Sequence, residues 1–275
     1  MNIKITEINA RSIITKSNLP DADYVINPYV GCTHACVYCY ARFMRRFTGH
    51  NEPWGSFIDV KINAEELFPR NMDKYSNKSV FLSSVTDPYN SLEKEYRITR
   101  NILKKLISVQ PVLSIQSKSS LITRDIDLLR EFKNCRVGLT ITSDTYETAK
   151  ILEPGASGID DRLTTLKMLH ENNIDAYVFI GPILPYITNW KKIIDMTKKF
   201  VTMYMFENAN LHGTIWKDVK NTVNNNFSDL SQKYDYFYAH RNEYWDKEES
   251  DIITYCTEND INHKMYFDHK KIRKN

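Results

Sequence analysis

The sequence predicts an α/β fold, a partial (β/α)6 TIM barrel with a C-terminal helical extension. Short apolar runs recur along the first 212 residues, and each is followed by an amphipathic stretch with helical spacing. The apolar runs are continuous rather than alternating, which is typical of buried parallel strands. About six strand–helix units fit before residue 212, whereas a closed barrel needs eight. A flavodoxin-like open sheet is the competing architecture.

The expected strands occupy residues 23–31, 80–88, 111–119, 136–143, 175–185 and 201–210. Helices are expected between them. In one, Ile98, Ile102 and Leu106 lie about one turn apart, and a second is expected over residues 162–173. Strand–helix–strand units at this pace form right-handed crossovers and a parallel sheet. We therefore expect a core domain over residues 1–212, with the polar, aromatic and helix-prone residues 213–275 packed on it.

The composition excludes several classes of protein. The 275 residues are 42% hydrophobic and 26% charged, as in ordinary globular proteins, and the net charge of +3 demands neither a nucleic acid nor a membrane partner. The first 19 residues lack the apolar core of a signal peptide, and no apolar run is long enough to cross a bilayer. We expect a cytoplasmic protein with reduced thiols, in which clustered cysteines indicate metal binding or catalysis.

Three of the five cysteines stand in the stretch GCTHACVYCY, residues 31–40. Structural zinc takes four ligands, and His34 lies too close in sequence to Cys32 and Cys36 to complete a tetrahedron comfortably. An electron-transfer [4Fe–4S] cluster takes four cysteines. Cys32, Cys36 and Cys39 would hold three irons and leave one iron open, and an open metal position is a reactive one.

Polar residues follow the expected strands, where the chemistry of parallel barrels gathers. After the second to sixth strands these residues include Thr86, Asp87, Gln116, Lys118, Ser143 and Glu207. A polar rim is ordinary because loops are polar. A lysine, several hydroxyls and three thiols on one rim nevertheless indicate a site.

The C-x3-C-x2-C loop, with Tyr38 before its last cysteine, resembles that of the radical S-adenosylmethionine (SAM) enzymes. The stretch NPYVGCTHACVYCYAR is similar in detail to the branch that includes spore photoproduct lyase. The resemblance covers about residues 23–190 and includes SSVTDPYNSLE, QSKS, TITSDT, LEPGASGIDDRLTTLKML and GPILPYITN. It identifies the chain as a relative of the lyase rather than the lyase itself.

The resemblance implies a radical SAM enzyme. Cys32, Cys36 and Cys39 would bind a [4Fe–4S] cluster, and the amino and carboxylate groups of SAM would chelate its open iron. The reduced cluster would cleave SAM to methionine and a 5′-deoxyadenosyl radical, which takes a hydrogen atom from an unidentified substrate. The implied partners are an electron donor such as flavodoxin or ferredoxin and, by analogy, a second radical SAM protein.

The resemblance also implies contacts with SAM. Tyr38 is expected near the adenine, while Thr86 and Ser143 match family hydroxyls that contact SAM. Lys118 is expected to bind the SAM carboxylate, since it is a cation at a strand end. The alternative for Lys118 is a solvated surface lysine.

Two further residues are expected at the cofactor. Arg162 would be a second carboxylate clamp, because its fork suits bidentate binding. Its alternative is an ion pair with Asp160 or Asp161. The turn at Gly181 would shape the adenine pocket, and the alternative is a plain end to a strand.

The sequence departs from the lyase pattern at one position. The lyase carries a cysteine next to its strand-two hydroxyl, and Ser84 stands near that place here. A serine O–H bond is too strong to return a hydrogen atom, so we expect a substrate other than the thymine dimer, whether nucleic acid, peptide or small molecule. We expect Cys135 and Cys256 to be structural.

The rival hypothesis is a metal-binding module without SAM chemistry. It would hold zinc or an iron–sulfur cluster and either transfer electrons or bind nucleic acid. Arg42, Arg45 and Arg46 follow the cysteine loop and would supply the basic surface. Iron content and SAM cleavage separate this hypothesis from the enzyme.

Overall fold

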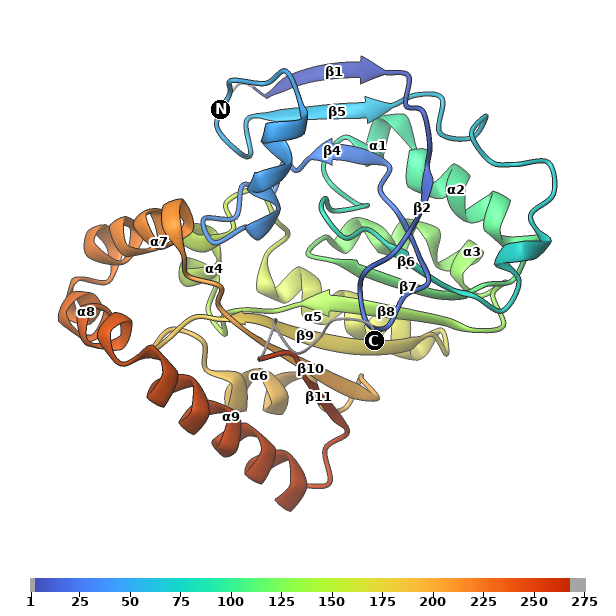
Figure 1. The fold of residues 1–275 in the computed structure, drawn as a ribbon. Coiled ribbons are helices and arrows are strands. Elements are labelled where there is room, and N and C mark those ends of the chain that lie inside the picture. The colour runs from blue at the N-terminus through green and yellow to red at the C-terminus, as the bar shows by residue number, and fades with distance from the viewer. Residues whose placement is uncertain (1–2, 268–275) are drawn as a thin grey trace.

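The computed structural model describes residues 3–267 of the chain (Figure 1). The strands are β1 (Lys4–Ile8), β2 (Ile14–Lys16), β3 (Tyr24–Ile26), β4 (Tyr29–Gly31), β5 (Phe57–Lys61), β6 (Ser79–Leu82), β7 (Val112–Ser117), β8 (Cys135–Thr140), β9 (Asp175–Ile183), β10 (Met203–Asn208) and β11 (His263–Met265). The α-helices are α1 (Glu93–Tyr96), α2 (Ile98–Ile107), α3 (Ile126–Leu129), α4 (Tyr146–Leu152), α5 (Ile159–Glu171), α6 (Trp190–Thr197), α7 (Gly213–Asn226), α8 (Ser231–Ala239) and α9 (Arg241–Glu258). The 3₁₀ helices are η1 (Tyr40–Phe47), η2 (Asp73–Tyr75), η3 (Ser120–Asp125) and η4 (Ser228–Leu230).

The main sheet has the strand order β11-β10-β9-β8-β7-β6-β3-β2. Neighbours from β3 to β11 are parallel, and β2 runs antiparallel to β3 at one edge. The α/β class with a mostly parallel sheet is therefore confirmed. Strands β3 and β6 to β10 follow one another in chain order, without the reversal of a flavodoxin-like sheet. Within residues 3–267 the edge strands β2 and β11 do not pair, so these strands form no closed barrel.

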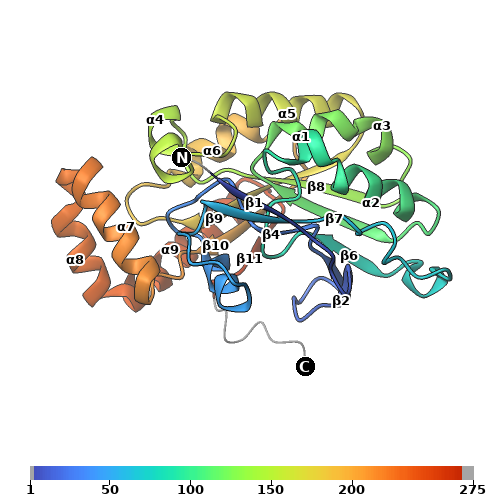
Figure 2. The ribbon, with the colours of Figure 1, turned by 90° about the horizontal axis from the view of Figure 1, so that it is seen from above.

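Helices cover one face of the main sheet because each carries an apolar stripe. Helix α2 buries Ile98, Ile102 and Leu106, as their spacing predicts. Figure 2 shows α1, α2, α3, α5 and α6 gathered on the same side of the sheet. Residues 137–140 of β8 are all buried, so both faces of this strand are covered, which explains why it reads as a continuous apolar run. No helix in residues 3–267 has the length and apolar content needed to span a membrane.

The segment expected as one strand over residues 23–31 is two strands in different sheets. Its first part is β3 of the main sheet, and its second part is β4 of a three-stranded sheet with the order β1-β5-β4 (Figure 1). Pro28 separates them, since it offers no N–H to a ladder and restricts the residue before it. The Asn27 side-chain oxygen accepts the Ser84 N–H at 2.9 Å, which fixes the turn. The chain therefore leaves the main sheet just before the cysteine loop.

The segment after His212 forms α7, α8 and α9, as expected, and then an unexpected strand. Strand β11 pairs in parallel with β10, so this segment extends the main sheet as well as packing beside it. Figure 1 shows the three helices together on one side of the molecule. A domain boundary at residue 212 stays a prediction, and residues 268–275 lie outside those that the structure describes.

Candidate active site

A cavity of about 400 Å³ lies at the C-terminal ends of the main-sheet strands. Alternation along each strand creates its wall. Gln116 of β7 and Phe179 of β9 line the cavity, whereas their neighbours Ile115 and Ile180 are buried in the hydrophobic core. The volume is in the range of pockets that bind small molecules and cofactors.

The three cysteines of the loop line this cavity. Burial raises the pKa of the Cys32 and Cys39 thiols, and it raises the pKa of Cys36 to about 12. A buried thiol stays protonated unless a cation holds it as the thiolate. Within residues 3–267, no three Cys, His, Asp or Glu side chains gather closely enough to coordinate one metal ion. The three thiols line one cavity without converging on a position for a single ion.

Residues 83–93, which follow β6, hold the first half of the cysteine loop. The Thr86 hydroxyl donates to the Gly31 carbonyl at 2.5 Å. The Ser91 hydroxyl donates to Thr33 Oγ1 at 3.1 Å, and the Ser91 N–H donates to the same oxygen at 3.2 Å. These contacts join two segments far apart in sequence, so the loop is fixed by the end of a neighbouring strand.

Asp87 and His34 form a buried pair within the same region. His34 Nδ1 lies 3.3 Å from Asp87 Oδ2, so His34 faces a carboxylate. Asp87 also accepts hydrogen bonds from the Ser117 hydroxyl at 2.7 Å and the Lys118 N–H at 2.8 Å. Burial opposes ionisation of Asp87, but the charge of His34 and these hydrogen bonds lower its pKa to about 2. Asp87 thus joins the cysteine loop to the end of β7.

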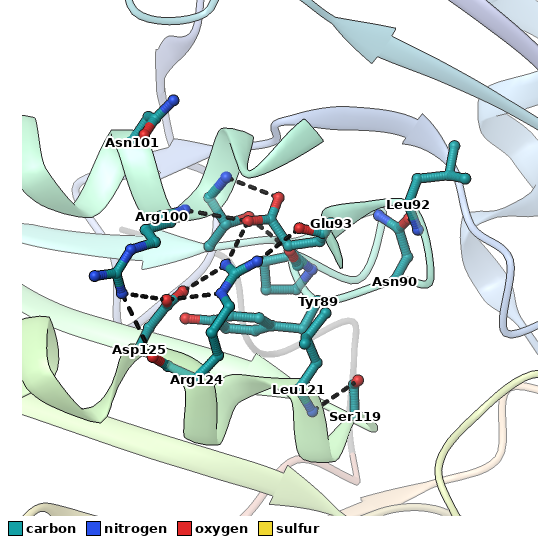
Figure 3. Close-up of polar contacts among 12 residues, drawn as sticks. Tyr89, Asn90, Leu92, Glu93, Arg100, Asn101, Ser119, Leu121, Arg124 and Asp125 are labelled. Atoms are coloured by element: carbon teal, nitrogen blue, oxygen red, sulfur yellow. Dashed lines mark hydrogen bonds and ion pairs between the residues drawn. The ribbon is translucent and has the colours of Figure 1, made fainter. Parts of the chain in front are cut away.

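A buried ion network anchors the strand that enters the loop (Figure 3). The Tyr29 hydroxyl donates to Glu93, whose carboxylate lies 2.7 Å from the Arg124 guanidinium. Arg124 also contacts Asp125 at 2.7 Å, and Arg100 contacts Asp125 at 2.7 Å. The Glu93 and Asp125 side chains are fully buried, so their charges depend on these partners. The network holds β4 in place through Tyr29, and none of its side chains lines the cavity.

A second buried centre, Glu153, holds the latter half of the cysteine loop. Its carboxylate accepts the hydroxyl protons of Tyr38 and, at 2.9 Å, of Thr142. Its other oxygen lies 2.5 Å from the Arg162 guanidinium. Arg162 is fully buried and also donates to the Thr140 carbonyl at 2.8 Å. Arg162 therefore pairs with Glu153, and not with Asp160 or Asp161.

The backbone around Glu153 also approaches the cysteine loop closely. The Val37 N–H donates to the Leu152 carbonyl at 2.9 Å, and the Gly155 N–H donates to the His34 carbonyl at 3.0 Å. A Cβ at Gly155 would lie 2.1 Å from the Thr33 carbonyl oxygen. Glycine is required there because any side chain would push the loop away.

Lys118 lines the cavity at the end of β7 and is half-buried. Its ammonium lies 5.7 Å from the centre of the Tyr38 ring. Burial opposes the charge of Lys118, but Cys36 and Glu153 raise its pKa overall. Lys118 is therefore a cavity cation rather than a solvated surface lysine.

The remaining sequence-predicted residues divide between the cavity and its surroundings. Thr86 lines the cavity. Among the described residues, Tyr38, Ser143, Arg162 and Gly181 are not part of its lining. Ser143 donates its hydroxyl to the Thr145 carbonyl at 2.9 Å, and Gly181 lies within β9.

Two cavity residues had no role assigned from the sequence. Glu207 lies at the end of β10, where burial raises its pKa to about 7 although Lys118 acts in the opposite direction. The sequence signal that could have pointed to Glu207 is its position at the end of an apolar strand. Trp54 reaches the cavity from the loop before β5, and nothing in the local pattern pointed to it. Cys256 is buried in α9 and Cys135 is partly buried in β8. Neither of these two cysteines lines the cavity.

The family of the chain follows from a comparison with family models. The model of the Radical SAM superfamily matches residues 26–200, which include the cysteine loop and the strands up to β9. The chain belongs to the radical SAM superfamily and is an enzyme whose chemistry depends on SAM. The resemblance expected from the sequence is confirmed.

Similar proteins support the same membership. The uncharacterized protein MJ0683 of Methanocaldococcus jannaschii is 40% identical over 225 residues, covering 82% of this chain and 84% of that protein. The radical SAM Nalpha-GlyT isomerase of Pseudomonas phage M6 is 26% identical over 163 residues, which is 58% of this chain and 33% of the isomerase. The chain thus spans only a third of that isomerase.

Solved structures share the fold. Spore photoproduct lyase complexed with dinucleoside spore photoproduct has a TM-score of 0.60 at 16% identity, covering 79% of this chain and 66% of the lyase chain. Streptococcus suis SuiB bound to precursor peptide SuiA has a TM-score of 0.52 at 15% identity, covering 89% of this chain and 48% of SuiB. At these identities the likeness concerns the fold alone.

Proposed function

We propose that Cys32, Cys36 and Cys39 bind a [4Fe–4S] cluster and that SAM occupies its open iron. The observation that carries this proposal is the set of three cysteines around one cavity, of which Cys32 and Cys36 are buried and Cys39 is partly buried. A mononuclear zinc site needs sulfur atoms about 2.3 Å from one point. In a [4Fe–4S] cluster each thiolate binds a different iron. Thiols that line one cavity without converging on a single-ion position therefore favour the cluster.

When bound, the reduced cluster supplies the electron that cleaves SAM to methionine and a 5′-deoxyadenosyl radical, which takes a hydrogen atom from the substrate. The protein has to orient the reactants and exclude water. Lys118 offers its ammonium to the SAM carboxylate from inside the cavity. The hydrogen bond from Tyr38 to Glu153 fixes the Tyr38 side chain, and its ring faces the Lys118 ammonium.

The other predicted SAM contacts remain proposals, and they differ in where they lie relative to the cavity. Thr86 donates its hydroxyl to the Gly31 carbonyl and lines the cavity, so its oxygen can still accept a hydrogen bond from SAM. We retain Ser143 as a SAM contact and Gly181 as a residue that shapes the adenine pocket. Arg162 already binds Glu153 and backbone carbonyls, so we propose that it acts on the site through Glu153.

The substrate is proposed to bind beyond SAM, against the wall of strands β7, β9 and β10. This wall combines aromatic and polar groups. The Tyr177 hydroxyl donates to Gln116 Oε1 at 3.2 Å, while Phe179 and Glu207 line the cavity beside them. Such a wall fits an organic substrate with both an apolar face and a polar edge. The named ligands of the structural neighbours, a dinucleoside photoproduct and a precursor peptide, give two substrate classes to assay first.

The test is anaerobic reconstitution with iron and sulfide, followed by reaction with SAM and a reductant. We expect a brown protein with about four irons that releases 5′-deoxyadenosine. Cys36→Ala should lower both the iron content and the nucleoside release to background. Cys135→Ala is the matched control and should retain both. A colourless protein with one zinc, or nucleoside release that survives Cys36→Ala, would contradict the proposal.

The rival function, a nucleic-acid-binding or electron-transfer module, has weaker support. Arg42 donates to the Cys39 carbonyl at 3.0 Å and the Val37 carbonyl at 2.6 Å and pairs with Asp218, so it is committed to the protein itself. A short basic surface from Arg45 and Arg46 is more often a solvated helix face. Iron–sulfur content without SAM binding would favour the electron-transfer form.

We further propose the setting in which this site works. The sequential, one-sided sheet fits a partial (β/α)6 barrel, with the segment after residue 212 beside it. Flavodoxin or ferredoxin would supply the electron, and a second radical SAM protein is a proposed partner. Reduced thiols and an iron–sulfur cluster fit a cytoplasmic location.

A further inference from the structure

Trp54 presents an unused hydrogen-bond donor to the cavity. Its indole lines the cavity, and its Nε1 atom is buried with no hydrogen-bond acceptor among the described residues. A buried indole N–H normally finds a partner, because an unpaired buried donor loses its hydrogen bond to water without a replacement. The orphaned donor therefore indicates an acceptor that is complete only when a bound group occupies the cavity.

The group beside this donor is the Cys39 thiol. Cys39 and Trp54 both line the cavity, and the Trp54 side chain lies within hydrogen-bonding range of the Cys39 thiol. The contact lacks the geometry of a full hydrogen bond, so the Trp54 N–H has no acceptor among the described residues. A neutral thiol is a weak acceptor, whereas an anionic sulfur is a stronger one.

The surrounding chain holds the Trp54 ring against the cysteine loop. Gly55 has a φ of +94°, and a Cβ there would lie 2.4 Å from the Ala35 Cβ, so this close approach requires glycine. The Trp54 ring packs edge-on against Phe57 at 5.8 Å. The His50 ring stacks on the Phe57 ring at 4.2 Å, which limits movement of Phe57.

We propose that Trp54 donates its indole N–H to the sulfur of Cys39 in the cluster-bound enzyme and thereby raises the reduction potential of the cluster. This inference rests on the proposed function. Reduction adds an electron to the cluster and its sulfur ligands, so a donor at sulfur stabilises the reduced state more than the oxidised one. Trp54 would therefore make the cluster easier to reduce by the physiological electron donor.

The direct test compares the reconstituted wild type with Trp54→Phe in a redox titration without SAM. Phenylalanine keeps an aromatic ring but removes the N–H. We expect a roughly tenfold weaker reduction equilibrium, which corresponds to about 59 mV toward negative potential for one electron. The matched control is Trp190→Phe on α6, which removes an indole N–H bonded to Glu248 away from the cavity and should leave the potential unchanged.

A second measurement uses isotope labelling. In the reduced wild type labelled with 15N at the tryptophan indole, pulsed electron paramagnetic resonance should detect one weakly coupled nitrogen, and Trp190→Phe should retain that coupling. An unchanged potential in a fully loaded Trp54→Phe protein would overturn the Trp54 inference alone, and so would the absence of the coupling. A wild type that loads no iron would overturn the proposed function, and the inference would fall with it.

Discussion

The cysteine loop and the C-terminal helices are held in place by different kinds of contact. The loop is fixed by buried, directional polar contacts, with Asp87 on one side and Glu153 on the other. The helices pack through rings, as where Trp216 stacks on Tyr238 at 4.2 Å and Phe237 meets Trp245 edge-on at 5.5 Å. Polar contacts permit one geometry, while ring packing tolerates small shifts. The molecule therefore uses its buried charges where atoms must be positioned and its aromatic rings where surfaces must be covered.

The largest effect should come from breaking the polar side of this comparison. Glu153→Gln leaves the fully buried Arg162 without its counter-charge. Removing one partner of a buried ion pair costs about 3–5 kcal/mol. We expect this loss in the free energy of unfolding of the cluster-free protein, measured by urea denaturation.

The matched control for this change is Glu147→Gln in the same region of sequence. Glu147 is exposed in α4, so its loss should change the free energy of unfolding by no more than about 0.5 kcal/mol. If Glu153→Gln costs as little as Glu147→Gln, the loop does not depend on its buried charges.

A smaller, pH-dependent effect should come from Glu207. Burial raises the pKa of its carboxyl from 4.5 to about 7, so the folded state favours the protonated form. Protonation of Glu207 therefore stabilises the folded state fully below pH 4.5, and this stabilisation is lost as the pH rises through 7. Glutamine does not titrate, so the stability of Glu207→Gln should not fall with pH for this reason. We expect the variant to gain about 2 kcal/mol over the wild type between pH 4.5 and pH 8, after allowance for partial exposure.

Unfolding free energies measured at several pH values would check this effect. Glu66→Gln, at an exposed position, serves as the control and should run parallel to the wild type. A difference between Glu207→Gln and the wild type that stays constant with pH would show that the Glu207 carboxyl titrates normally in the folded protein.

The smallest effect should come from the aromatic side of the comparison. Phe237 is buried among the rings of the C-terminal helices, and Phe237→Leu keeps an apolar side chain there. We expect a loss of about 1 kcal/mol in unfolding free energy and SAM cleavage within twofold of the wild type. A tenfold fall in SAM cleavage with unchanged iron content would show that these helices also position the reacting groups.

Much of this organisation could be predicted from the sequence, but the partners of individual residues could not. The strand periodicity predicted the main sheet, because buried parallel strands need continuous apolar runs. The preference of Arg162 for a carboxylate was also predictable. Its partner was not, since Glu153 reaches it through the turn after α4 rather than through the helix that carries Arg162.

The sequence by itself determined the family and the cysteine loop, because the spacing of Cys32, Cys36 and Cys39 is a local property of the chain. Only the tertiary structure decided what surrounds that loop. Trp54, Asp87 and Glu153 meet it from separate elements, and buried polar groups find partners according to three-dimensional proximity rather than sequence distance. Local pattern marks the cysteines of such a site, and the fold decides which side chains surround them.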